Sequence, residues 1–446
     1  MGRRLQAQRL HVWLNGQAVG YWDVTQGRHA FSYFDEWCSD EAGRPLSLSL
    51  PFQPFNVAYR GAIVQNYFDN LLPDSQQIRH RMAQHFRTAG SEAHQLLAAV
   101  GRDCVGAIQL LAPEEQPENL FSISAVPLDA SGVAGILRNT LAGAPLGLDS
   151  GKIDLRLSIA GTQEKSALLW HQGQWHLPTG NTPTTHILKL PMGLVGNMRA
   201  DMRSSVDNEW LCSRIMEAFG LPAAPCRIDS FDGMKVLIVE RFDRRLSHDG
   251  SWIVRLPQED FCQASGTSPL QKYQADGGPG ITHIMQILLG SAQAQRDRRC
   301  FFKTQLVFWL LAATDGHAKN FSIFHLPGSQ FQATPLYDVL SAHPIIGTGA
   351  HQLAPQHVKL AMALCGANKH YHLHQIGRQH WASHARQVGL GATTAETIIE
   401  EVLASAEAVV TTAYALLPPG FPTDVAESIL GGILRQCQRL QDKARV

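Results

Sequence analysis

The sequence predicts an α+β protein with a small N-terminal α+β subdomain, a strand-rich lobe and a mostly helical C-terminal lobe. The chain has 446 residues, more than a single core usually serves. Strand-like alternation is frequent up to about residue 245, and helical periodicity dominates from there to the end. A polar, proline-containing segment, LAPEEQPENLFSIS (111–124), connects the first part to the rest. We therefore expect domains at 1–110, 111–245 and 246–446, with a cleft between the two lobes.

The composition is that of a soluble globular protein, with 44% hydrophobic and 17% charged residues. Lys+Arg and Asp+Glu number 38 each, so net charge gives no reason to expect the chain to bind nucleic acid or a membrane by itself. The first residues lack the apolar region of a signal peptide, and no run is long enough to span a bilayer. The eight cysteines form no CxxC pair, which favours reduced, mostly buried thiols over disulfides or a zinc site. We expect a cytoplasmic protein.

The first 110 residues combine strand and helix patterns. LHVWLNGQAVGYWDV (10–24) alternates on both sides of an Asn-Gly pair, which indicates a β-hairpin. PLSLSLPF (45–52) predicts another strand. Helical periodicity follows at 61–86 and again in EAHQLLAAVG (92–101). These patterns predict a small α+β unit.

The next segment predicts strands, one long helix and a hairpin, and the remainder is expected to be mostly helical. The long helix should end at Gly220, a C-cap, and Pro222 prevents its continuation. The strands are LRLSIA (155–160), KSALLW (165–170), QWHLPT (174–179) and THILKLP (185–191), the helix is 204–220, the hairpin is 225–244, and NFSIF (320–324) and FQATPLYDV (331–339) interrupt the helical part.

A polar heptad, TDGHAKN, lies between two apolar segments that must both be buried. Its Asp315 and Asn320 have the D-x-x-x-x-N spacing of a protein-kinase catalytic loop. In such a loop the aspartate receives the proton of an attacking hydroxyl, and the asparagine offers a neutral oxygen to Mg²⁺. Lys319 would then neutralise charge on the transferred phosphoryl group. The alternative is a polar turn in which Asp315 acts only as a cap.

A second acidic residue, Asp338 in TPLYDVL, follows after another strand-like piece. A kinase lobe delivers its second metal-binding carboxylate in this way. The alternative is an N-cap on a following helix. The two roles are compatible, but the order favours a metal ligand.

Lys189 lies within the apolar strand THILKLP. A buried lysine is costly unless its charge is paired. A kinase would use this lysine to hold the α and β phosphates and would pair it with a helix carboxylate, for which Glu209 is the candidate. The alternatives are an edge strand with Lys189 facing water and a solvent-exposed Glu209.

Two further segments fit a nucleotide site only weakly. SIAGTQEKSALL carries a single glycine, Gly161, where a protein kinase has G-x-G-x-x-G, although backbone amides and Lys165 there would suit phosphates. LIVERFDRR ends a strand at Glu240, Arg241 and Phe242, where a hinge would offer backbone groups to an adenine. An ordinary turn and an ordinary interlobe linker would look the same.

These features follow one another in the order of a two-lobed kinase, and longer motifs add a family resemblance. The sequence resembles, over nearly its whole length, the HipA family of serine/threonine-kinase toxins from bacterial type II toxin–antitoxin pairs. The motifs that carry the resemblance are RPLSLSLP, FDNLLPDS, GRDCVGAI, TPTTHILKLP, SVDNE, VERFDRR, RLPQEDFCQ, DGGPGI, ATDGHAKNFS and LYDVLSA.

The resemblance implies a two-lobed kinase-like fold and a role for each matching site residue. Asp315 would be the proton acceptor, and Asn320 and Asp338 would hold Mg²⁺. Ser158 matches the family's autophosphorylated serine, whose modification expels the adjacent loop and silences the kinase. The residues implied to surround ATP are Ala160, Gly161, Thr162, Gln163, Glu164, Lys165, Lys189, Glu240, Arg241, Phe242, His317, Ala318, Lys319, Asn320, Tyr337, Asp338, Val339 and Leu340.

The resemblance also implies partners. Family members phosphorylate glutamyl-tRNA synthetase, which stops translation and promotes dormancy, or persistence. An antitoxin, HipB, binds the toxin and the operator DNA and represses the operon, so DNA contact would come mainly through the antitoxin. The N-terminal subdomain, 1–110, is expected to serve contact with such a partner. A phosphate on Ser158 would add about −1.5 to −2 charges beside a phosphate site, which disfavours the loop that covers ATP. The alternative for Ser158 is an ordinary strand serine.

Two rival functions come from other classes. One is a non-catalytic, kinase-like scaffold that binds an antitoxin and DNA, but such a scaffold has no need of Asp315, Asn320, Asp338 and Lys189 together. The other is a small-molecule or lipid kinase, because these enzymes share the divergent ATP loop. A comparison of protein and metabolite acceptors would separate them.

Overall fold

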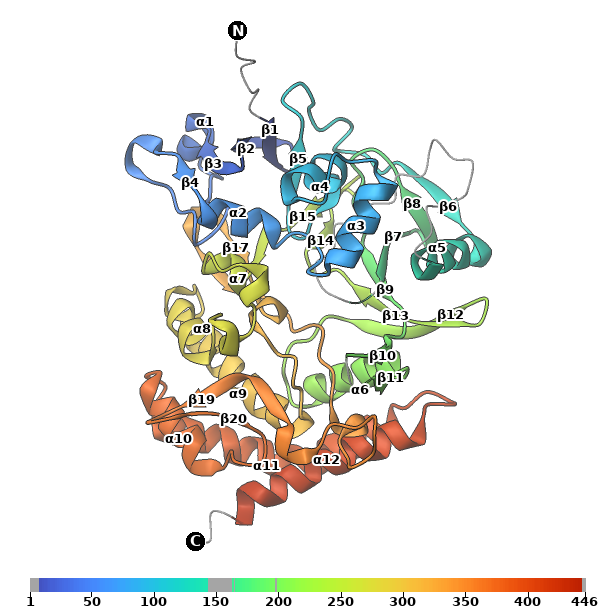
Figure 1. Ribbon diagram of the computed structural model, residues 1–446, viewed down its shortest axis with the longest axis vertical. Helices are drawn as coiled ribbons and strands as arrows, with labels where there is room; N and C mark the ends of the chain where they lie inside the picture. The colour runs from blue at the N-terminus through green and yellow to red at the C-terminus, as the bar shows by residue number, and fades with distance from the viewer. Residues whose placement is uncertain (1–7, 143–162, 164, 197–198, 443–446) are drawn as a thin grey trace.

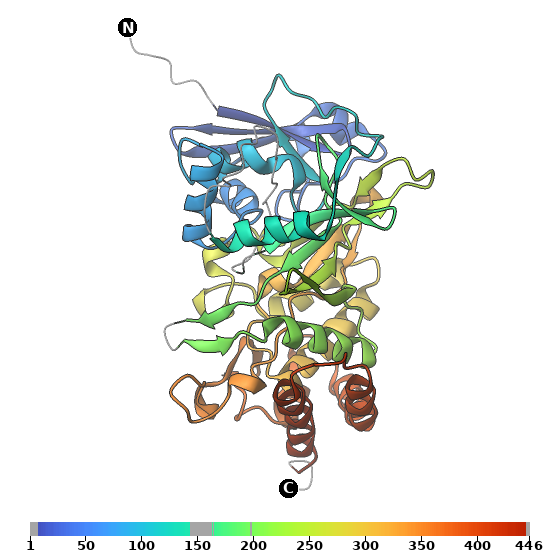
Figure 2. The ribbon, with the colours of Figure 1, turned by 90° about the vertical axis from the view of Figure 1, so that its right-hand side faces the viewer.

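The computed structural model describes residues 8–142, 163, 165–196 and 199–442, and the predicted α+β fold class is confirmed. The N-terminal subdomain and the last helices lie at opposite ends of the longest axis (Figures 1 and 2). None of the helices in the described ranges is both long and apolar enough to cross a membrane. All eight cysteines are free thiols, and five of them are buried.

The N-terminal subdomain is an antiparallel five-stranded sheet in the order β4-β3-β2-β1-β5, with helices packed on it. The predicted hairpin is confirmed, because β1 pairs with β2 across the Asn-Gly turn. Trp22 from β2 stacks on Phe68 from α2, with ring centroids 4.0 Å apart, at the centre of this core. The elements are β1 (Gln8–Leu14), β2 (Gln17–Thr25), β3 (Arg28–Tyr33), α1 (Asp35–Ser39), β4 (Tyr59–Arg60), α2 (Ala62–Asp69), α3 (Gln76–His85), α4 (Ala93–Val100) and β5 (Ile108–Leu111).

The prediction of a strand at 45–52 is wrong, because this segment is a series of turns. Its leucines alternate with serines, but burial does not alternate, because Ser47 is as fully buried as Leu46 and Leu50. The amide of Leu46, however, donates to the Tyr33 hydroxyl, and that of Leu48 to a carboxylate oxygen of Glu259. Side chains thus satisfy these backbone groups and replace a strand partner.

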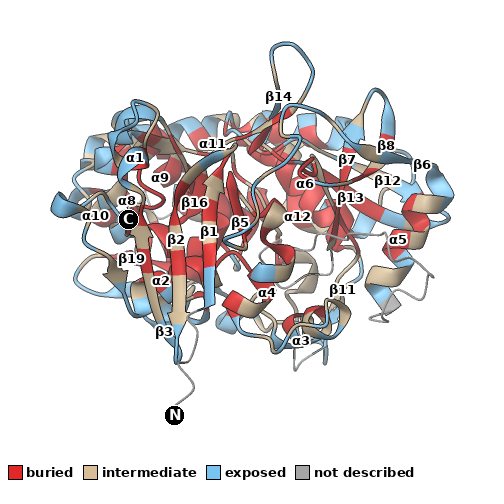
Figure 3. Cartoon of the chain, turned by 90° about the horizontal axis from the view of Figure 1, so that it is seen from above, coloured by how far each residue is buried: buried red, intermediate tan, exposed pale blue. Residues whose placement is uncertain are grey.

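The strand-rich lobe is built on a six-stranded antiparallel sheet in the order β12-β13-β9-β7-β8-β6. α5 lies across one face (Figure 2), and α6 packs against β12 and β13. Figure 3 shows α6 and the central strands β7 and β13 as largely buried. The predicted strand at 155–160 lies outside the described residues. The elements are β6 (Ala125–Leu128), α5 (Ala130–Ala142), β7 (Lys165–His171), β8 (Gln174–Pro178), β9 (His186–Lys189), β10 (Gly193–Val195), β11 (Ala200–Met202), α6 (Ser205–Ala218), β12 (Cys226–Phe231) and β13 (Met234–Glu240).

The alternation of side chains along β9 places a lysine beside α6. Leu188 belongs to the core that β7, β9 and β13 form with α5. Its neighbour Lys189 therefore points to the opposite face, where α6 lies. Lys165 on β7 is directly opposite Lys189 in the strand register and shares that face.

α6 ends as the sequence predicts. Gly220 has φ +74°, and its amide donates to the carbonyl of Glu217 at 2.8 Å, while the amide of Leu221 donates to Met216 at 3.0 Å. This pair of hydrogen bonds is a Schellman motif, which needs a residue with positive φ after the helix. The cap fixes the end of the helix that carries Glu209.

The C-terminal lobe is mostly helical, as predicted, with the buried helix α9 at its centre. The predicted interruptions are strands β17 and β18, but the β14–β15 hairpin, β16 and the β19–β20 hairpin were not predicted. The elements are β14 (Arg244–Leu246), β15 (Ile253–Arg255), β16 (Gln258–Asp260), α7 (Phe261–Ala264), α8 (Ile281–Ile287), α9 (Ala294–Leu311), β17 (Ser322–His325), β18 (Phe331–Ala333), β19 (Lys359–Cys365), β20 (Lys369–His372), α10 (Arg378–Gln387), α11 (Ala392–Ala415) and α12 (Thr423–Asp442).

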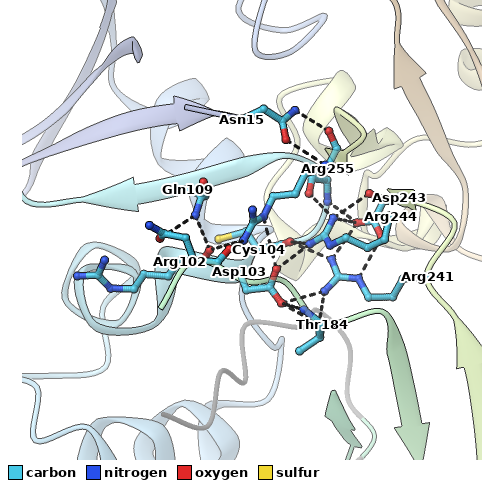
Figure 4. A network of polar contacts seen from close by, with 12 residues as sticks. Asn15, Arg102, Asp103, Cys104, Gln109, Thr184, Arg241, Asp243, Arg244 and Arg255 are labelled. Atoms are coloured by element: carbon cyan, nitrogen blue, oxygen red, sulfur yellow. Dashed lines mark hydrogen bonds and ion pairs between the residues drawn. The ribbon is translucent and has the colours of Figure 1, made fainter. Parts of the chain in front are cut away.

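A buried network of charged residues joins the N-terminal subdomain to the segment that links the two lobes (Figure 4). Asp103 accepts from Arg244 at 2.9 Å and from Arg241 at 3.4 Å. Its second oxygen, Oδ2, also accepts from the Thr184 hydroxyl at 2.7 Å. Asp243 accepts from Arg241 at 2.9 Å. All of these groups are buried, so the subdomain and the linker are held together by paired charges rather than by an apolar interface alone.

Candidate active site

A cavity between the two lobes collects most of the predicted site residues, and the N-terminal subdomain closes one side of it. Asn70, Asp74 and Val105 come from that subdomain. The predicted residues that line the cavity are Lys165, Lys189, Glu240, Arg241, Phe242, Asp315, His317, Lys319, Asn320, Tyr337 and Asp338.

Lys189 is held between two carboxylates. Its Nζ lies 2.6 Å from Oε1 of Glu209 on α6 and 2.7 Å from Oδ1 of Asp338. The side chains of Lys189 and Glu209 are only 8% and 7% exposed. The predicted pairing of these two residues is therefore confirmed, and the alternatives in which either one faces water are wrong.

Burial and ion pairing act in opposite directions on this group of charges. Burial alone would lower the pKa of Lys189, but Asp338 and Glu209 raise it above its usual value. Burial would raise the pKa of Asp338, but Lys189 and Lys165 hold it well below its usual range. Lys189 is therefore an ammonium and Asp338 a carboxylate near neutral pH.

Lys165 lines the same cavity, but its pKa is lowered where that of Lys189 is raised. Burial lowers its pKa to about 8, with Lys189 adding to that effect and Asp338 opposing it. The neighbouring Gln163 donates from Nε2 to the carbonyl of Leu190 at 2.6 Å. Lys165 therefore changes charge close to physiological pH.

The TDGHAKN loop follows α9 and reaches the opposite side of the cavity. Asn320 donates from Nδ2 to the backbone carbonyl of Asp315 at 2.9 Å. This bond turns its Oδ1 away from that carbonyl. The Asp315 carboxylate is 55% exposed, with Nε2 of the buried His317 3.9 Å away. Asp315 thus presents an accessible carboxylate at the mouth of the cavity.

Tyr273 donates a short hydrogen bond to the Asp315 carboxylate. Its ring meets the His317 ring edge to face, with centroids 5.0 Å apart. Burial, followed by the charge of Asp315, raises the pKa of Tyr273 above its usual value, so this hydroxyl remains a donor. Tyr273 was not predicted from the sequence, because it lies 42 positions from Asp315 and no local pattern links the two.

Asp74 reaches the same region from the connection between α2 and α3. Its Oδ1 lies 2.7 Å from Nζ of Lys319, and its Oδ2 lies 2.8 Å from Nζ of Lys272. Burial would raise the pKa of Asp74, but Lys319 and Lys272 lower it to about 2. Asp74 was not predicted as a site residue, although it lies in the family motif FDNLLPDS.

Asp338 has a backbone conformation that few residues adopt, with φ +61°. Aspartate tolerates this left-handed region better than most side chains do, and such outliers are typical of functional sites. The next helical segment begins only after Ala342, so the alternative of Asp338 as an N-cap is wrong. The strained turn instead aims its carboxylate at Lys189.

Other predicted residues lie beside the cavity or contribute differently. Val339 lines a smaller adjoining pocket, Ala318 is packed in the core, and Leu340 lines neither pocket. The guanidinium of Arg241 is engaged by Asp103 and Asp243, its amide donates to the carbonyl of Thr185 at 2.9 Å, and its carbonyl accepts from the amide of Arg244 at 3.1 Å. Ser158, Ala160, Gly161, Thr162 and Glu164 lie outside the described residues.

The cavity contains a further carboxyl group that the sequence analysis did not identify. Asp260 caps the N-terminus of α7, with its Oδ1 accepting from the amide of Gln263 at 2.8 Å. Burial raises its pKa to about 7, although Lys319 opposes this effect. The local signal, E-D-F-C-Q, predicts a capping box rather than a site. The other lining residues that were not predicted are Ile187, Val239, Asp243, Gln258, Gln263 and Lys272.

The fold and the site together define a class of protein. A strand-borne lysine paired with a helix glutamate faces a loop with aspartate and asparagine five positions apart across an interlobe cavity. This is the arrangement of a two-lobed, kinase-like protein.

Comparison with known families identifies the group to which the chain belongs. The model of the HipA-like C-terminal domain matches residues 157–410, and that of the HipA N-terminal domain matches residues 10–111. The chain therefore belongs to the HipA family and is a kinase of the HipA type.

Individual relatives agree with this assignment. A putative kinase, Y4mE, of Sinorhizobium fredii is 34% identical over 391 residues, which cover 86% of each chain. The serine/threonine-protein kinase toxin HipA of Shewanella oneidensis is 28% identical and covers 72% of this chain and 71% of its own length. The solved complex of HipA, HipB and operator DNA from Shewanella oneidensis contains a chain with the same fold, with a TM-score of 0.78, 23% identity, and coverage of 98% of this chain and 99% of that one.

Proposed function

We propose that this protein is an ATP- and Mg²⁺-dependent serine/threonine kinase toxin that uses Asp315 as its proton acceptor. The observation that carries the proposal is the placement of Lys189 between Glu209 and Asp338, at 2.6 and 2.7 Å, on the wall of a cavity that Asp315 and Asn320 also line. A binding scaffold would gain nothing from burying this lysine between two carboxylates beside an accessible aspartate.

The residues present fit a magnesium nucleotide. Across the described part of the chain, no group of three or more His, Cys, Asp or Glu side chains is placed to hold a metal ion. Mg²⁺ in phosphoryl-transfer sites, however, is usually held by one or two carboxylates together with substrate phosphates and waters. The Asp338 carboxylate and the Asn320 Oδ1 are hard oxygen ligands of this kind. When bound there, Mg²⁺ would neutralise charge on the phosphates.

Each residue then has a defined task. Lys189, kept protonated by its two carboxylates, would hold the α and β phosphates, and Lys165 would add a second positive charge. Asp315 would orient the acceptor hydroxyl and take its proton, after that hydroxyl displaces Tyr273. Glu240, the backbone of Arg241 and the ring of Phe242 would border the adenine. His317, Ala318, Tyr337, Val339 and Leu340 would support the nucleotide from the helical lobe.

The finer assignments follow from the family. We propose glutamyl-tRNA synthetase as the acceptor, with arrest of translation as the result, and autophosphorylation of Ser158 as the off-switch. A HipB-type antitoxin would be the partner, and operator DNA would be contacted mainly through it. The Shewanella oneidensis chain with the same fold was solved with HipB and operator DNA, which supports this partnership.

The test is transfer of labelled phosphate. The purified chain is incubated with Mg²⁺ and γ-labelled ATP, alone and with glutamyl-tRNA synthetase. The Asp315→Asn variant should lose about 10²- to 10⁴-fold in transfer rate, the usual contribution of a positioned base. Asp276→Asn, which alters an exposed aspartate in the same region, is the matched control and should keep the wild-type rate.

The pattern of labelling decides between the rivals. Label on Ser158 and on the synthetase supports the whole proposal, whereas label on Ser158 alone keeps the kinase and rejects the acceptor. Transfer only to a small molecule would favour the metabolite-kinase alternative. Absence of any transfer from unmodified protein that binds antitoxin would favour the scaffold.

A further inference from the structure

Asp74 bridges two lysines that belong to a different part of the molecule. It lies in the short connection between α2 and α3 of the N-terminal subdomain, and its side chain is only 10% exposed. Its two carboxylate oxygens are divided between Lys319, at 2.7 Å, and Lys272, at 2.8 Å. Both lysine side chains are also largely buried, at 4% and 12% exposure.

Each of these lysines is next in sequence to a group at the proposed reaction centre. Lys319 precedes Asn320, and Lys272 precedes Tyr273, whose hydroxyl donates to Asp315. One carboxylate therefore fixes the loop that carries Asn320 and the segment that contacts Asp315. The side chains of Asp74, Lys319 and Lys272 all line the same cavity.

The position of Asp74 is itself anchored by hydrogen bonds across the same interface. Asn70 donates from Nδ2 to the carbonyl of Thr267 at 2.9 Å, and Asn66 donates to the carbonyl of Gly266 at 2.8 Å. Nζ of Lys319 also lies 3.4 Å from the carbonyl of Asn70. The end of α2 is thus fixed to the segment just before Lys272, so the carboxylate of Asp74 is presented from a rigid support.

We propose that Asp74 is a positioning residue for phosphoryl transfer, through which the N-terminal subdomain sets the place of Lys319 in the catalytic loop. This inference rests on the proposed kinase function. Asp74 and its two lysines together carry one positive charge, which faces the cavity where phosphates would bind. Without the carboxylate, two buried ammonium groups would repel each other, and the loop would shift. The active site is then incomplete without the N-terminal subdomain, whose function is not limited to contact with partners.

The test uses the full-length chain and separates position from charge. Asp74→Asn removes the charge, and Asp74→Glu keeps it but moves the carboxylate by one methylene. The control is Asp69→Asn. It breaks the ion pair that joins Asp69, at the end of α2, to the buried Arg79 of α3, and neither residue lines the cavity. We measure kcat for phosphate transfer, the Kd for a non-hydrolysable ATP analogue, and the Tm of each variant.

A positioning role predicts a selective loss. Asp74→Asn should lower kcat roughly 10- to 100-fold, the effect of a small misplacement of catalytic groups. Asp74→Glu should keep the wild-type Tm and still lose kcat. The Kd for the analogue should change by no more than about twofold in either variant, and Asp69→Asn should keep kcat within the same margin.

A double-mutant cycle with Lys319→Met tests the route of the effect. In the Lys319→Met background, Asp74→Asn should cost no more than about twofold further in kcat, because its target has been removed. If Asp74→Asn lowers kcat equally with and without Lys319, the proposal is overturned. It is also overturned if Asp74→Glu keeps the wild-type kcat while Asp74→Asn and Asp69→Asn lower kcat by equal factors. If the wild-type chain binds the analogue but transfers no phosphate to any acceptor, the proposed kinase function itself fails. Activity of the wild-type chain therefore separates failure of that function from failure of the positioning role of Asp74.

Discussion

The charged residues of the cleft differ in how firmly their partners hold them. Lys189 has two carboxylates within 2.7 Å and is fixed as an ammonium. Lys165, opposite it on β7, is half-buried, and desolvation lowers its pKa to about 8, with Asp338 opposing this effect. Asp315 is accessible and is contacted by a tyrosine hydroxyl. These differences lead to two predictions about single residues.

Nucleotide affinity should decrease as the pH rises through the pKa of Lys165. Below about pH 8 the ammonium attracts the phosphates, and above it the neutral amine does not, so only the protonated form contributes to binding. The Kd for an ATP analogue should therefore increase about tenfold between pH 7 and pH 9. The measurement is calorimetric titration across this range. Lys165→Met should show a flat profile, and a wild-type profile equally flat would contradict the prediction.

Removal of the Tyr273 hydroxyl should make Asp315 easier for an acceptor to reach. The acceptor hydroxyl has to displace this donor, and a hydrogen bond contributes about 1 kcal/mol net. Tyr273→Phe should therefore raise kcat/KM for the protein acceptor about fivefold and leave the KM for ATP unchanged. Steady-state kinetics with each substrate varied in turn gives both values. A lower kcat/KM would show that Tyr273 assists the reaction instead.

At the same scale, the sequence identified residues whose spacing reflects local chemistry. Asp315 and Asn320 were found from their separation, and Lys189 from the cost of burying an amine in an apolar strand. Asp74 was not, because its partner Lys319 is 245 positions away and no local pattern links the two. Tyr273 escaped for the same reason, since it reaches Asp315 across 42 positions.

At the scale of elements, patterns that depend on neighbours along the chain were reliable. The Asn-Gly hairpin and the end of α6 at Gly220 are set by the turn chemistry of those residues. After Lys359, the strand β19 is a continuous apolar run, LAMALC, which periodicity alone does not separate from a buried helix. In PLSLSLPF the pattern predicts a strand that does not form. Its serines alternate with leucines because the Ser47 hydroxyl donates to Glu259 and the Ser49 hydroxyl donates to the carbonyl of Gln263.

At the scale of the whole molecule, the network around Asp103 joins three parts of the chain. Asp103 comes from the N-terminal subdomain, Thr184 from the segment before β9, and Arg241 and Arg244 from the interlobe linker. Arg255 adds a third guanidinium, with its Nε 3.7 Å from Oδ1 of Asp103. Because the linker is fixed to the subdomain, the two lobes have a common support on one side of the cleft.

Asp103→Asn should destabilise the folded protein by about 3–5 kcal/mol, the cost of leaving buried charges without their partner. The measurement is the free energy of unfolding in urea. Asp232→Asn is the control, because its ion pair with Arg138 is exposed, at 55% for the arginine and 43% for the aspartate, and should be worth about 0–1 kcal/mol. A cost for Asp103→Asn no larger than that of the control would contradict the prediction.

The position of Asp103 also bears on how the chain is synthesised. The N-terminal sheet is complete once β5 has emerged, and it encloses a core of its own, so this subdomain can fold while the remainder is still being translated. The guanidinium groups of Arg241 and Arg244 follow 138 and 141 positions after the carboxylate that will bind them. At roughly 5–20 residues per second, this aspartate waits about 7–30 s for its partners. A subdomain that folds in that interval would carry the Asp103 carboxylate without the two arginines that bind it in the finished protein, and the arrival of these arginines would then fix the linker in place.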